Sequence, residues 1–265
     1  MQLNSNPADN PICYLHPRRR LLSAWVQHVP FGMYLVDALR PAVIVELGTR
    51  NGVSYCAFCQ AVQHLGIDSR CTAVDSWQGD PHTGAYGPRV LADLRLHHDP
   101  LYGRFSRLSQ NTFDEAAARF ADRSIDLLHI DGFHTYEAAS HDFEHWLPKL
   151  SDHGVVLLHD IAERGRGFGV WRLWSEISAR YPSFAFEHGH GLGVVGVGNA
   201  VPAPVRDLLR LSDPDAARLR KFFLMQGRRV AFRITLDLAA RLPARGAAAA
   251  AELVRRLSMG SASGG

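Results

Sequence analysis

Short apolar runs rich in β-branched residues alternate along most of the chain with stretches whose apolar residues recur every three or four positions. The runs predict strands and the stretches predict helices. The expected strands are 43–47, 71–74, 105–108, 125–130 and 154–159, and the expected helices are 53–65, 113–120, 136–147 and 170–181. Strands that alternate with helices in this way favour an α/β fold with a mostly parallel sheet.

Two further runs, 184–186 and 192–197, flank a turn that contains His188 and His190. Runs this close together predict a hairpin. The sheet is therefore expected to end in an antiparallel strand near the C-terminal side of the domain.

Both ends of the chain show helical spacing. Residues 18–39 predict two short helices that are broken at Pro30-Phe-Gly, and residues 205–258 predict helices separated at Asp213-Pro214 and Pro243. We expect a helical N-terminal segment, a central ligand-binding domain and a helical C-terminal appendage, with boundaries 1–40, 41–200 and 201–265.

The last part of this appendage has a biased composition. Ala247–Ala251 favours a helix, and Gly260–Gly265 is expected to be disordered.

The bulk composition is that of an ordinary soluble protein, with 46% hydrophobic and 21% charged residues. No apolar run approaches the roughly 18 residues needed to cross a bilayer. Residues 1–17 lack the charged and then apolar pattern of a secretory leader. We therefore expect no membrane span and a cytoplasmic location.

The net charge of +3 is unevenly distributed, because the residues from Ala203 onward carry 12 Lys and Arg against 5 Asp and Glu. The body is mildly acidic, which disfavours a nucleic-acid partner. Phe222, Phe223, Leu224 and Phe232 are too apolar to leave exposed, so the C-terminal helices are expected to form a homo-oligomer contact. A solvated basic face is the alternative.

The 4 cysteines are too few for a disulfide scaffold in a chain of 265 residues. Cys56 and Cys59 have the spacing of a redox or zinc pair, but they fall inside a predicted helix and no second pair matches them. We interpret them as packed core thiols.

The loop after the first predicted strand is the most informative segment of the chain. Glu46 lies near the end of that strand, and Gly48 and Gly52 follow it. Glycines allow a sharp turn and a close approach of a ligand to the backbone, as in the first unit of a nucleotide-binding α/β domain. Their spacing is not that of a dinucleotide site. Glu46 would repel a pyrophosphate but could accept hydrogen bonds from a cationic or hydroxyl-bearing ligand.

Four predicted strands end in an acidic residue: Glu46, Asp75, Asp131 and Asp160. The carboxyl ends of parallel strands meet at the edge where α/β proteins bind ligands. Asp75 follows the glycine loop at about the distance of a ribose-binding acid. Any one of these acids could be a plain turn cap, but four at one edge favour a site.

Asp131 and Asp160 form a second group with His134. If their strands are neighbours, the two carboxylates lie about 5 Å apart and repel each other unless a cation or a shared proton separates them. Such oxygen ligands suit a hard divalent ion such as magnesium. His134 is placed to take a proton near neutral pH, or else it caps the next helix.

The segment 76–87 is rich in aromatic residues and glycine, and we expect it to cover a ligand. Trp77 could stack on a purine, shield the site from water, or simply anchor the loop at the surface. Of the 14 histidines, His188 and His190 could face the site from the hairpin turn, and their role stays open.

These residues resemble class I S-adenosylmethionine-dependent methyltransferases, in particular a small bacterial group associated with glycosyltransferases. The resemblance covers about residues 41–198, and its motifs are Val45–Gly52, Val74–Asp80, Ile125–Tyr136 and Gly154–Asp160. It implies a Rossmann-like methyltransferase sheet and S-adenosylmethionine as cofactor. It places Glu46, Gly48 and Gly52 around the methionine part and Asp75 on the ribose, with Thr49, Ser76 and Trp77 at the same site.

Asp131, His134 and Asp160 are also similar to the Asp-x-x-His and terminal Asp of metal-dependent sugar O-methyltransferases. In those enzymes the aspartates hold magnesium and the histidine is the proposed base. This chain has His159 where they have a glutamate, and imidazole is a poorer ligand for a hard ion. Either His159 joins Asp131 and Asp160 around the ion, another carboxylate completes the shell, or no metal is required.

The expected function is S-adenosylmethionine-dependent O-methylation of a hydroxyl on a sugar or glycosylated small molecule. Two alternatives remain. One is a non-catalytic partner module of a glycosyltransferase, docked through the basic tail. The other is a nicotinamide-dependent oxidoreductase, which Glu46 and the missing third glycine disfavour.

Overall fold

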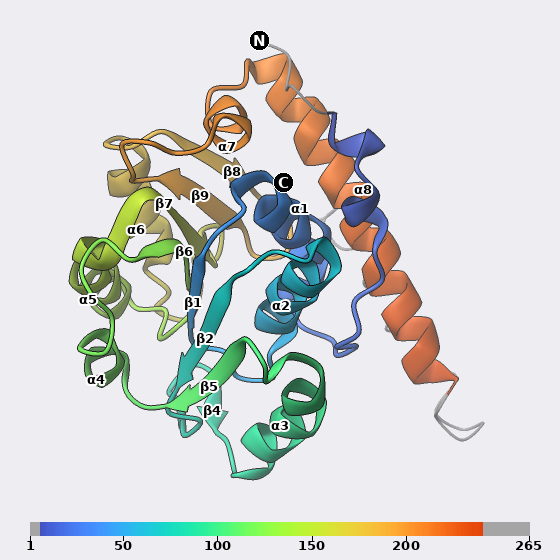
Figure 1. Ribbon diagram of the computed structural model, residues 1–265, viewed down its shortest axis with the longest axis vertical. Helices are drawn as coiled ribbons and strands as arrows, with labels where there is room; N and C mark the ends of the chain where they lie inside the picture. The colour runs from blue at the N-terminus through green and yellow to red at the C-terminus, as the bar shows by residue number, and fades with distance from the viewer. Residues whose placement is uncertain (1–5, 241–265) are drawn as a thin grey trace.

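The computed structural model describes residues 6–240, and the predictions for Ala247–Ala251 and Gly260–Gly265 lie outside these residues. A seven-stranded sheet forms the centre of the molecule (Figure 1). Its strands are β1 (Val43–Leu47), β2 (Arg70–Asp75), β5 (Ser106–Gln110), β6 (Ile125–Ile130), β7 (Leu150–His159), β8 (Ser183–Phe186) and β9 (Leu192–Gly196).

The order of the strands is β5-β2-β1-β6-β7-β9-β8. The first five strands in this order are parallel to one another, whereas β9 is antiparallel to both of its neighbours, β7 and β8. This confirms the predicted α/β class with a mostly parallel sheet and an antiparallel hairpin. The chain turns from β1 outward to β2 and later crosses back to β6, so the switch in strand order lies between β1 and β6.

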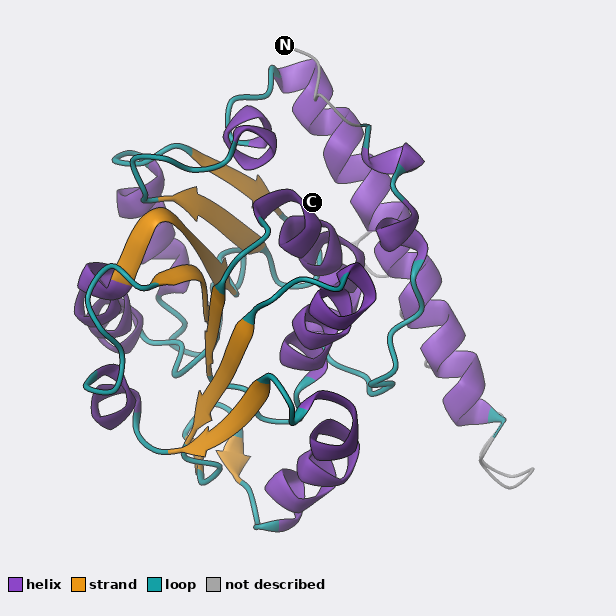
Figure 2. Cartoon of the chain, in the orientation of Figure 1, coloured by secondary structure: helices purple, strands orange, loops and turns teal. Residues whose placement is uncertain are grey.

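Helices cover both faces of the sheet (Figures 1 and 2). The helices are α1 (Val29–Leu39), α2 (Val53–Leu65), α3 (Arg89–Tyr102), α4 (Phe113–Ala117), α5 (Tyr136–Trp146), α6 (Val170–Ser178), α7 (Ala203–Leu208) and α8 (Asp213–Ala239), with 3-10 turns η1 (Pro7–Asp9), η2 (Pro11–Tyr14), η3 (Ala24–His28) and η4 (Leu147–Lys149). Alternate residues of the buried strands supply the two faces: Ile44 and Leu127 join the core under α1 and α2, and Val45 and Leu128 join the core under α5 and α6. Such two-sided burial is typical of parallel strands.

Helix α8 runs along the outside of the α1 layer, in orange to red in Figure 1. Its inner residues Leu219, Phe223 and Ile234 are buried in the same core as α1 and η3. The helix also approaches η3 very closely, because a Cβ on Gly227 would lie 2.1 Å from the carbonyl oxygen of Gln27. No helix among residues 6–240 combines the length and apolar character that crossing a membrane requires.

The predicted break at Pro30-Phe-Gly is wrong, because η3 leads directly into α1. Pro30 lies in the first turn of α1, where its missing N–H would have no partner in the helix anyway. Gly32 is inside the helix, and a Cβ there would lie 2.6 Å from the ring of Trp25. The glycine thus permits close packing of an aromatic side chain rather than a turn.

Two elements were not predicted. Helix α3 buries only a narrow stripe, Leu91, Leu94, His98 and Tyr102, so its apolar periodicity is weak. The small hairpin of β3 (Gly79–Asp80) and β4 (Gly84–Ala85) has no apolar run at all. It is held by the Asp80 carboxylate, which accepts hydrogen bonds from the turn.

Asp142 is an acidic residue of α5 that is buried against the loop after β6. Burial raises the pKa of its carboxyl to about 7, nearby His141 lowers it and Asp114 raises it. A carboxyl whose pKa is higher in the folded state binds its proton more tightly there. Its contribution to stability is therefore full below the unfolded-state pKa of about 4 and is lost as the pH rises through 7.

We predict that the Asp142→Asn variant does not lose this stability as the pH rises. The free energy of unfolding of the variant, relative to the wild type, should increase by about 2–4 kcal/mol between pH 4 and pH 8. Urea unfolding across this range measures it. The exposed neighbour Glu144 provides the control, because Glu144→Gln should give a difference that is flat with pH. A flat difference for Asp142→Asn would show that the carboxyl is not desolvated.

Candidate active site

The carboxyl ends of β1, β2, β6 and β7 meet at one edge of the sheet. The register places Leu47 beside both Val74 and Ile130, and Ile130 beside Leu158. The residues that follow these strands therefore surround one cavity of about 590 Å³. Among the predicted site residues, its lining includes Gly48, Thr49, Gly52, Asp75, Ser76, Asp131, His134, His159, Asp160 and His190.

Asp75 is held on one side of this cavity by the loop after β1. One carboxylate oxygen accepts the backbone N–H of Arg50 and the other accepts that of Trp77, each at 2.7 Å. Burial raises the pKa of Asp75, while these two N–H groups favour its ionised form. Each oxygen retains a lone pair for a ligand, so the side chain is oriented and still able to accept two hydroxyl groups.

Gly48 and Gly52 have conformations that suit glycine, with φ of +87° and +74°. A Cβ on Gly48 would lie 2.0 Å from the carbonyl oxygen of Asp131, and one on Gly52 would lie 2.5 Å from Leu94. The first glycine thus lets the loop after β1 contact the end of β6. These glycines shape the cavity wall whether or not a ligand is bound.

Glu46 is fully buried and does not line the cavity. Its Oε2 accepts a hydrogen bond of 2.8 Å from Nδ1 of His129, and Nε2 of His129 accepts one of 3.0 Å from the indole N–H of Trp25. An indole can only donate, so Nε2 must be the acceptor and the proton must sit on Nδ1. His129 and Trp25 were missed in the sequence; the signal for His129 was a polar residue inside an apolar strand.

Two buried polar atoms, one at the end of β1 and one in the loop after it, have no hydrogen-bond partner among the described residues. They are Oε1 of Glu46 and Oγ1 of Thr49. Buried polar groups in native proteins are nearly always paired. A ligand with hydrogen-bond donors beside this loop would satisfy Thr49, which lines the cavity, so this side of the cavity fits the methionine end of S-adenosylmethionine.

Trp77 is buried and does not line the cavity. Its indole N–H donates to the carbonyl oxygen of Arg50 at 3.0 Å, and its φ is +51°. It therefore supports the loop that holds Asp75 instead of stacking on a ligand or anchoring the surface. The rest of its segment does border the cavity through Gly79, Asp80, His82, Thr83 and Tyr86.

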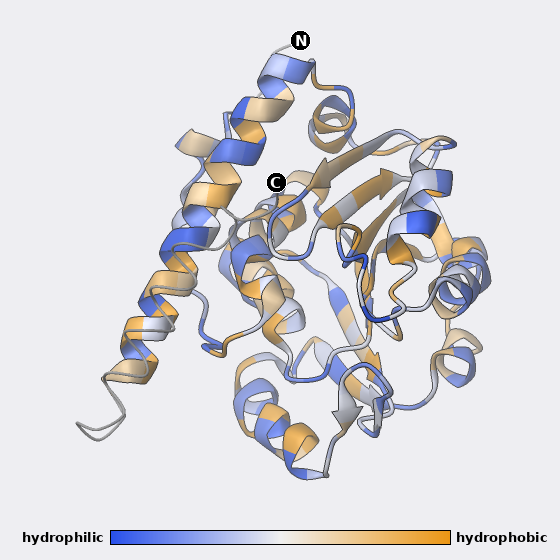
Figure 3. Ribbon diagram, turned by 180° about the vertical axis from the view of Figure 1, so that it is seen from behind, coloured by the Kyte–Doolittle hydropathy of each residue, from blue (hydrophilic) through white to orange (hydrophobic). Residues whose placement is uncertain are grey.

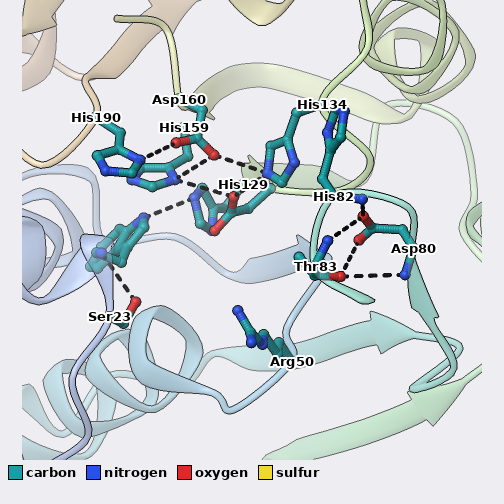
Figure 4. Close-up of polar contacts among 12 residues, drawn as sticks. Ser23, Arg50, Asp80, His82, Thr83, His129, His134, His159, Asp160 and His190 are labelled. Atoms are coloured by element: carbon teal, nitrogen blue, oxygen red, sulfur yellow. Dashed lines mark hydrogen bonds and ion pairs between the residues drawn. The ribbon is translucent and has the colours of Figure 1, made fainter. Parts of the chain in front are cut away.

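The opposite side of the cavity holds a compact cluster of carboxylates and imidazoles (Figure 4). Nε2 of His134 lies 2.9 Å from Oδ2 of Asp160 and 3.5 Å from Oδ1 of Asp131. Nδ1 of His159 lies 3.2 Å from Oδ1 of Asp131 and 3.3 Å from Oδ2 of Asp160. His190 completes the group, with its Nδ1 3.1 Å from Oδ1 of Asp160.

The charges in this cluster compensate one another. Nε2 of His159 faces the carbonyl oxygen of Gly189 at 3.0 Å, so both nitrogens of the ring face acceptors and both carry protons. Although burial opposes it, the two carboxylates raise the pKa of His159 well above its usual range and that of His134 to about 9. Burial likewise opposes ionisation of Asp131 and Asp160, but the imidazoles hold the pKa of both well below its usual range.

Asp131, His134 and Asp160 also form the part of the cluster best arranged for a metal ion, with one donor atom from each within 4.8 Å of the others. Two carboxylates fit a divalent ion. Nδ1 of His159 points toward both carboxylates and its Nε2 toward Gly189. The protonated ring therefore competes with an ion for the carboxylates, and it would have to lose a proton to bind the ion itself.

The histidines of the hairpin turn are separated by the structure. His190 lines the cavity and contacts Asp160, whereas His188 stacks on His28 with ring centroids 4.7 Å apart. Burial lowers the pKa of His188 to about 4. His28 was not singled out in the sequence. Among residues 6–240 we find no hydrogen bond between His28 and a residue that lines the cavity, but its Nε2 contacts the same Gly189 carbonyl oxygen as Nε2 of His159.

Part of the chain is similar to a known family. Residues 45–161 match the model of a family described as a methyltransferase domain. The uncharacterized protein y4gI of Sinorhizobium fredii (strain NBRC 101917 / NGR234) is 50% identical over 188 residues, which are 71% of this chain and 21% of that protein. The chain thus spans about a fifth of the length of this curated relative.

Solved structures share the fold. Cofactor-bound Rv0187 from MTB superposes with a TM-score of 0.51 at 15% identity, covering 71% of this chain and 90% of that one. The O-methyltransferase TomG of Streptomyces achromogenes, involved in tomaymycin synthesis and solved in complex with S-adenosylmethionine, gives 0.50 at 12% identity, covering 68% and 82%. At these identities the likeness establishes the fold alone. Residues 45–161 are thus similar to a methyltransferase domain, and the chain has the Rossmann-like fold of these structures.

The close approach of Gly48 to Asp131 gives a direct test of the site's architecture. We predict that Gly48→Ala lowers the free energy of unfolding by about 3 kcal/mol, through left-handed strain and overpacking. Gly66→Ala is the matched control, because Gly66 also has a positive φ of +61° but a Cβ there meets nothing within 4 Å. It should cost only about 1 kcal/mol. Equal losses in denaturant unfolding would contradict the contact.

Proposed function

We propose that the protein is an S-adenosylmethionine-dependent O-methyltransferase that acts on a hydroxyl group of a sugar or glycosylated small molecule. The observation that carries the proposal is the shared cavity. It joins Asp75 and the glycine loop on one side to Asp131, His134 and Asp160 on the other. Cofactor and acceptor groups would thus lie within one site, as transfer between them requires.

The cofactor side is supported by hydrogen-bonding capacity that the protein leaves unused. Asp75 would accept the ribose hydroxyls and Oγ1 of Thr49 would accept from the methionine end, whereas Glu46 lies behind the cavity wall. When bound, S-adenosylmethionine supplies an activated methyl group on a cationic sulfur. The carboxylates at this edge of the sheet favour a cationic ligand over a pyrophosphate.

The acceptor side is supported by the cluster around Asp160. A hydroxyl group is a poor nucleophile until its proton leaves. Nε2 of His134 already faces Asp160, so Nδ1, which has no hydrogen-bond partner among the described residues, would be the nitrogen that takes this proton. Asp160, at 2.9 Å, would stabilise the resulting imidazolium. A divalent ion on Asp131 and Asp160 would lower the pKa of the hydroxyl. By competing with His134 for both carboxylates it would also lower the pKa of His134, which they raise to about 9.

The sugar assignment has weaker support than the reaction type. It rests on the resemblance to sugar O-methyltransferases and on the polar cavity wall, where Asp80, Thr83 and Asn111 offer hydrogen bonds to a hydroxyl-rich acceptor. TomG, which shares the fold, is an O-methyltransferase.

We predict that isothermal titration detects one S-adenosylhomocysteine per wild-type chain. Asp75→Asn should weaken this binding about tenfold or more, because one charged acceptor is lost from the ribose. Asp68→Asn, on the exposed loop before β2, should leave it unchanged. Absence of binding, or protection from thermal unfolding by NADH instead, would remove the proposal.

The role of His134 is tested separately. His134→Ala should bind S-adenosylhomocysteine within about threefold of the wild type, yet methyl transfer to sugar and glycoside acceptors should fall by about 10²–10⁴-fold. The readout is transfer of labelled methyl from S-adenosylmethionine, with and without Mg²⁺. Full turnover by His134→Ala would contradict its assignment as the base and leave the cofactor site intact.

A further inference from the structure

The outward face of α8 exposes three large apolar side chains. Met225, Phe232 and Leu236 are 60%, 50% and 48% exposed. They are spaced seven and four residues apart, so they lie along one line on a helix with about 3.6 residues per turn. In Figure 3, hydrophobic and hydrophilic bands alternate along this helix at the edge of the molecule.

Basic residues flank this apolar line on both sides. Lys221 and Arg228 lie on one flank, and Arg229 and Arg233 lie on the other; all four are exposed. With the apolar side chains they occupy an arc of roughly 140° on the helix. None of the four forms an ion pair with any of residues 6–240. We call these seven residues the α8 face.

The orientation of the α8 face is fixed by packing. The opposite side of α8 is buried against α1 and η3, and Gly227 brings its backbone against Gln27. Of the acidic residues of α8, Asp215 and Asp237 are only partly exposed and are paired with Arg218 and Arg20, and the exposed Asp213 lies in the first turn, outside this arc. The exposed arc is therefore uniformly basic around an apolar centre.

Charge decides which occupant suits this face. The segment 241–265 carries Arg241, Arg245, Arg255 and Arg256 against the single acid Glu252, so it would be repelled. A second copy of the chain, docked face to face, would bring the same unpaired cations together. A negatively charged surface is complementary to the α8 face.

We propose that the α8 face binds an anionic membrane surface. On this 27-residue helix, the α8 face runs from Lys221 to Leu236, a line about 22 Å long. The apolar side chains would enter the boundary between headgroups and acyl chains, while the flanking Arg and Lys contact lipid phosphates. An acidic protein would need a matching apolar pocket, whereas a lipid surface needs none. The helix lies on the membrane and does not cross it.

The buried side of α8, opposite to this surface, connects it to the cavity wall. Helix α8 packs directly on η3, and Ser23, Ala24 and Trp25 at the start of that turn line the cavity. The inference is independent of the proposed reaction, because it rests on charge and exposure outside the site.

Co-sedimentation of the full chain with vesicles tests the proposal. The wild type should bind vesicles that mix phosphatidylglycerol with phosphatidylcholine, should not bind pure phosphatidylcholine, and should be released as salt increases. Arg228→Gln with Arg229→Gln should weaken binding more than tenfold, since each basic residue contributes about fivefold. Phe232→Ser should weaken it about tenfold.

The controls are substitutions of the same type at exposed positions outside the α8 face. Leu96 on α3 is 80% exposed, and Arg119 follows α4; Leu96→Ser and Arg119→Gln should bind as the wild type does. Equal binding to both vesicle types, unchanged binding of the α8 variants, or a wild-type dimer that Phe232→Ser dissociates would overturn the proposal. Binding to polyglutamate as tight as to the anionic vesicles, and insensitive to Phe232→Ser, would assign the face to acidic proteins instead.

Discussion

The parallel register of β1, β2, β6 and β7 forces acidic residues together at one edge of the sheet, and the rest of the site depends on how their charge is balanced. Asp131 and Asp160 are compensated by the imidazoles of His134 and His159 within about 3.5 Å. Glu46 accepts a hydrogen bond from Nδ1 of His129, the residue beside it on β6. Asp75 has no such cation and relies on backbone N–H groups, which leaves it free to meet a ligand.

This balance divides the acids into two kinds. Those paired with imidazoles form a neutral cluster that changes its protonation only when a cation or an acceptor competes for the carboxylates. Acids that are bound by backbone N–H groups, or that have an oxygen without a partner, can still accept hydrogen bonds from a ligand. A site that recognises a cationic sulfur and activates a hydroxyl needs both kinds, and one cavity holds them.

Much of this arrangement could be predicted from the sequence, because it follows from where strands end. The β-branched runs predicted the strand positions, and an acid or glycine after each run marked the edge of the sheet that binds a ligand.

What could not be predicted depends on contacts between distant segments. Trp25 and His129 are 104 residues apart, and nothing local to Trp25 signals a hydrogen bond to the site. The burial of Trp77 and the separation of His188 from His190 likewise depend on tertiary packing, which periodicity does not encode. Helix α3 was missed because a histidine, His98, occupies one of its few buried positions.

The most direct measurement is a crystal structure of the full chain with S-adenosylhomocysteine. The account predicts both ribose hydroxyls within hydrogen-bond distance of the Asp75 carboxylate, the homocysteine end beside Gly48 and Thr49, and the sulfur turned toward Asp131, His134 and Asp160. A ligand bound away from this edge, or one whose sulfur points away from that cluster, would contradict it.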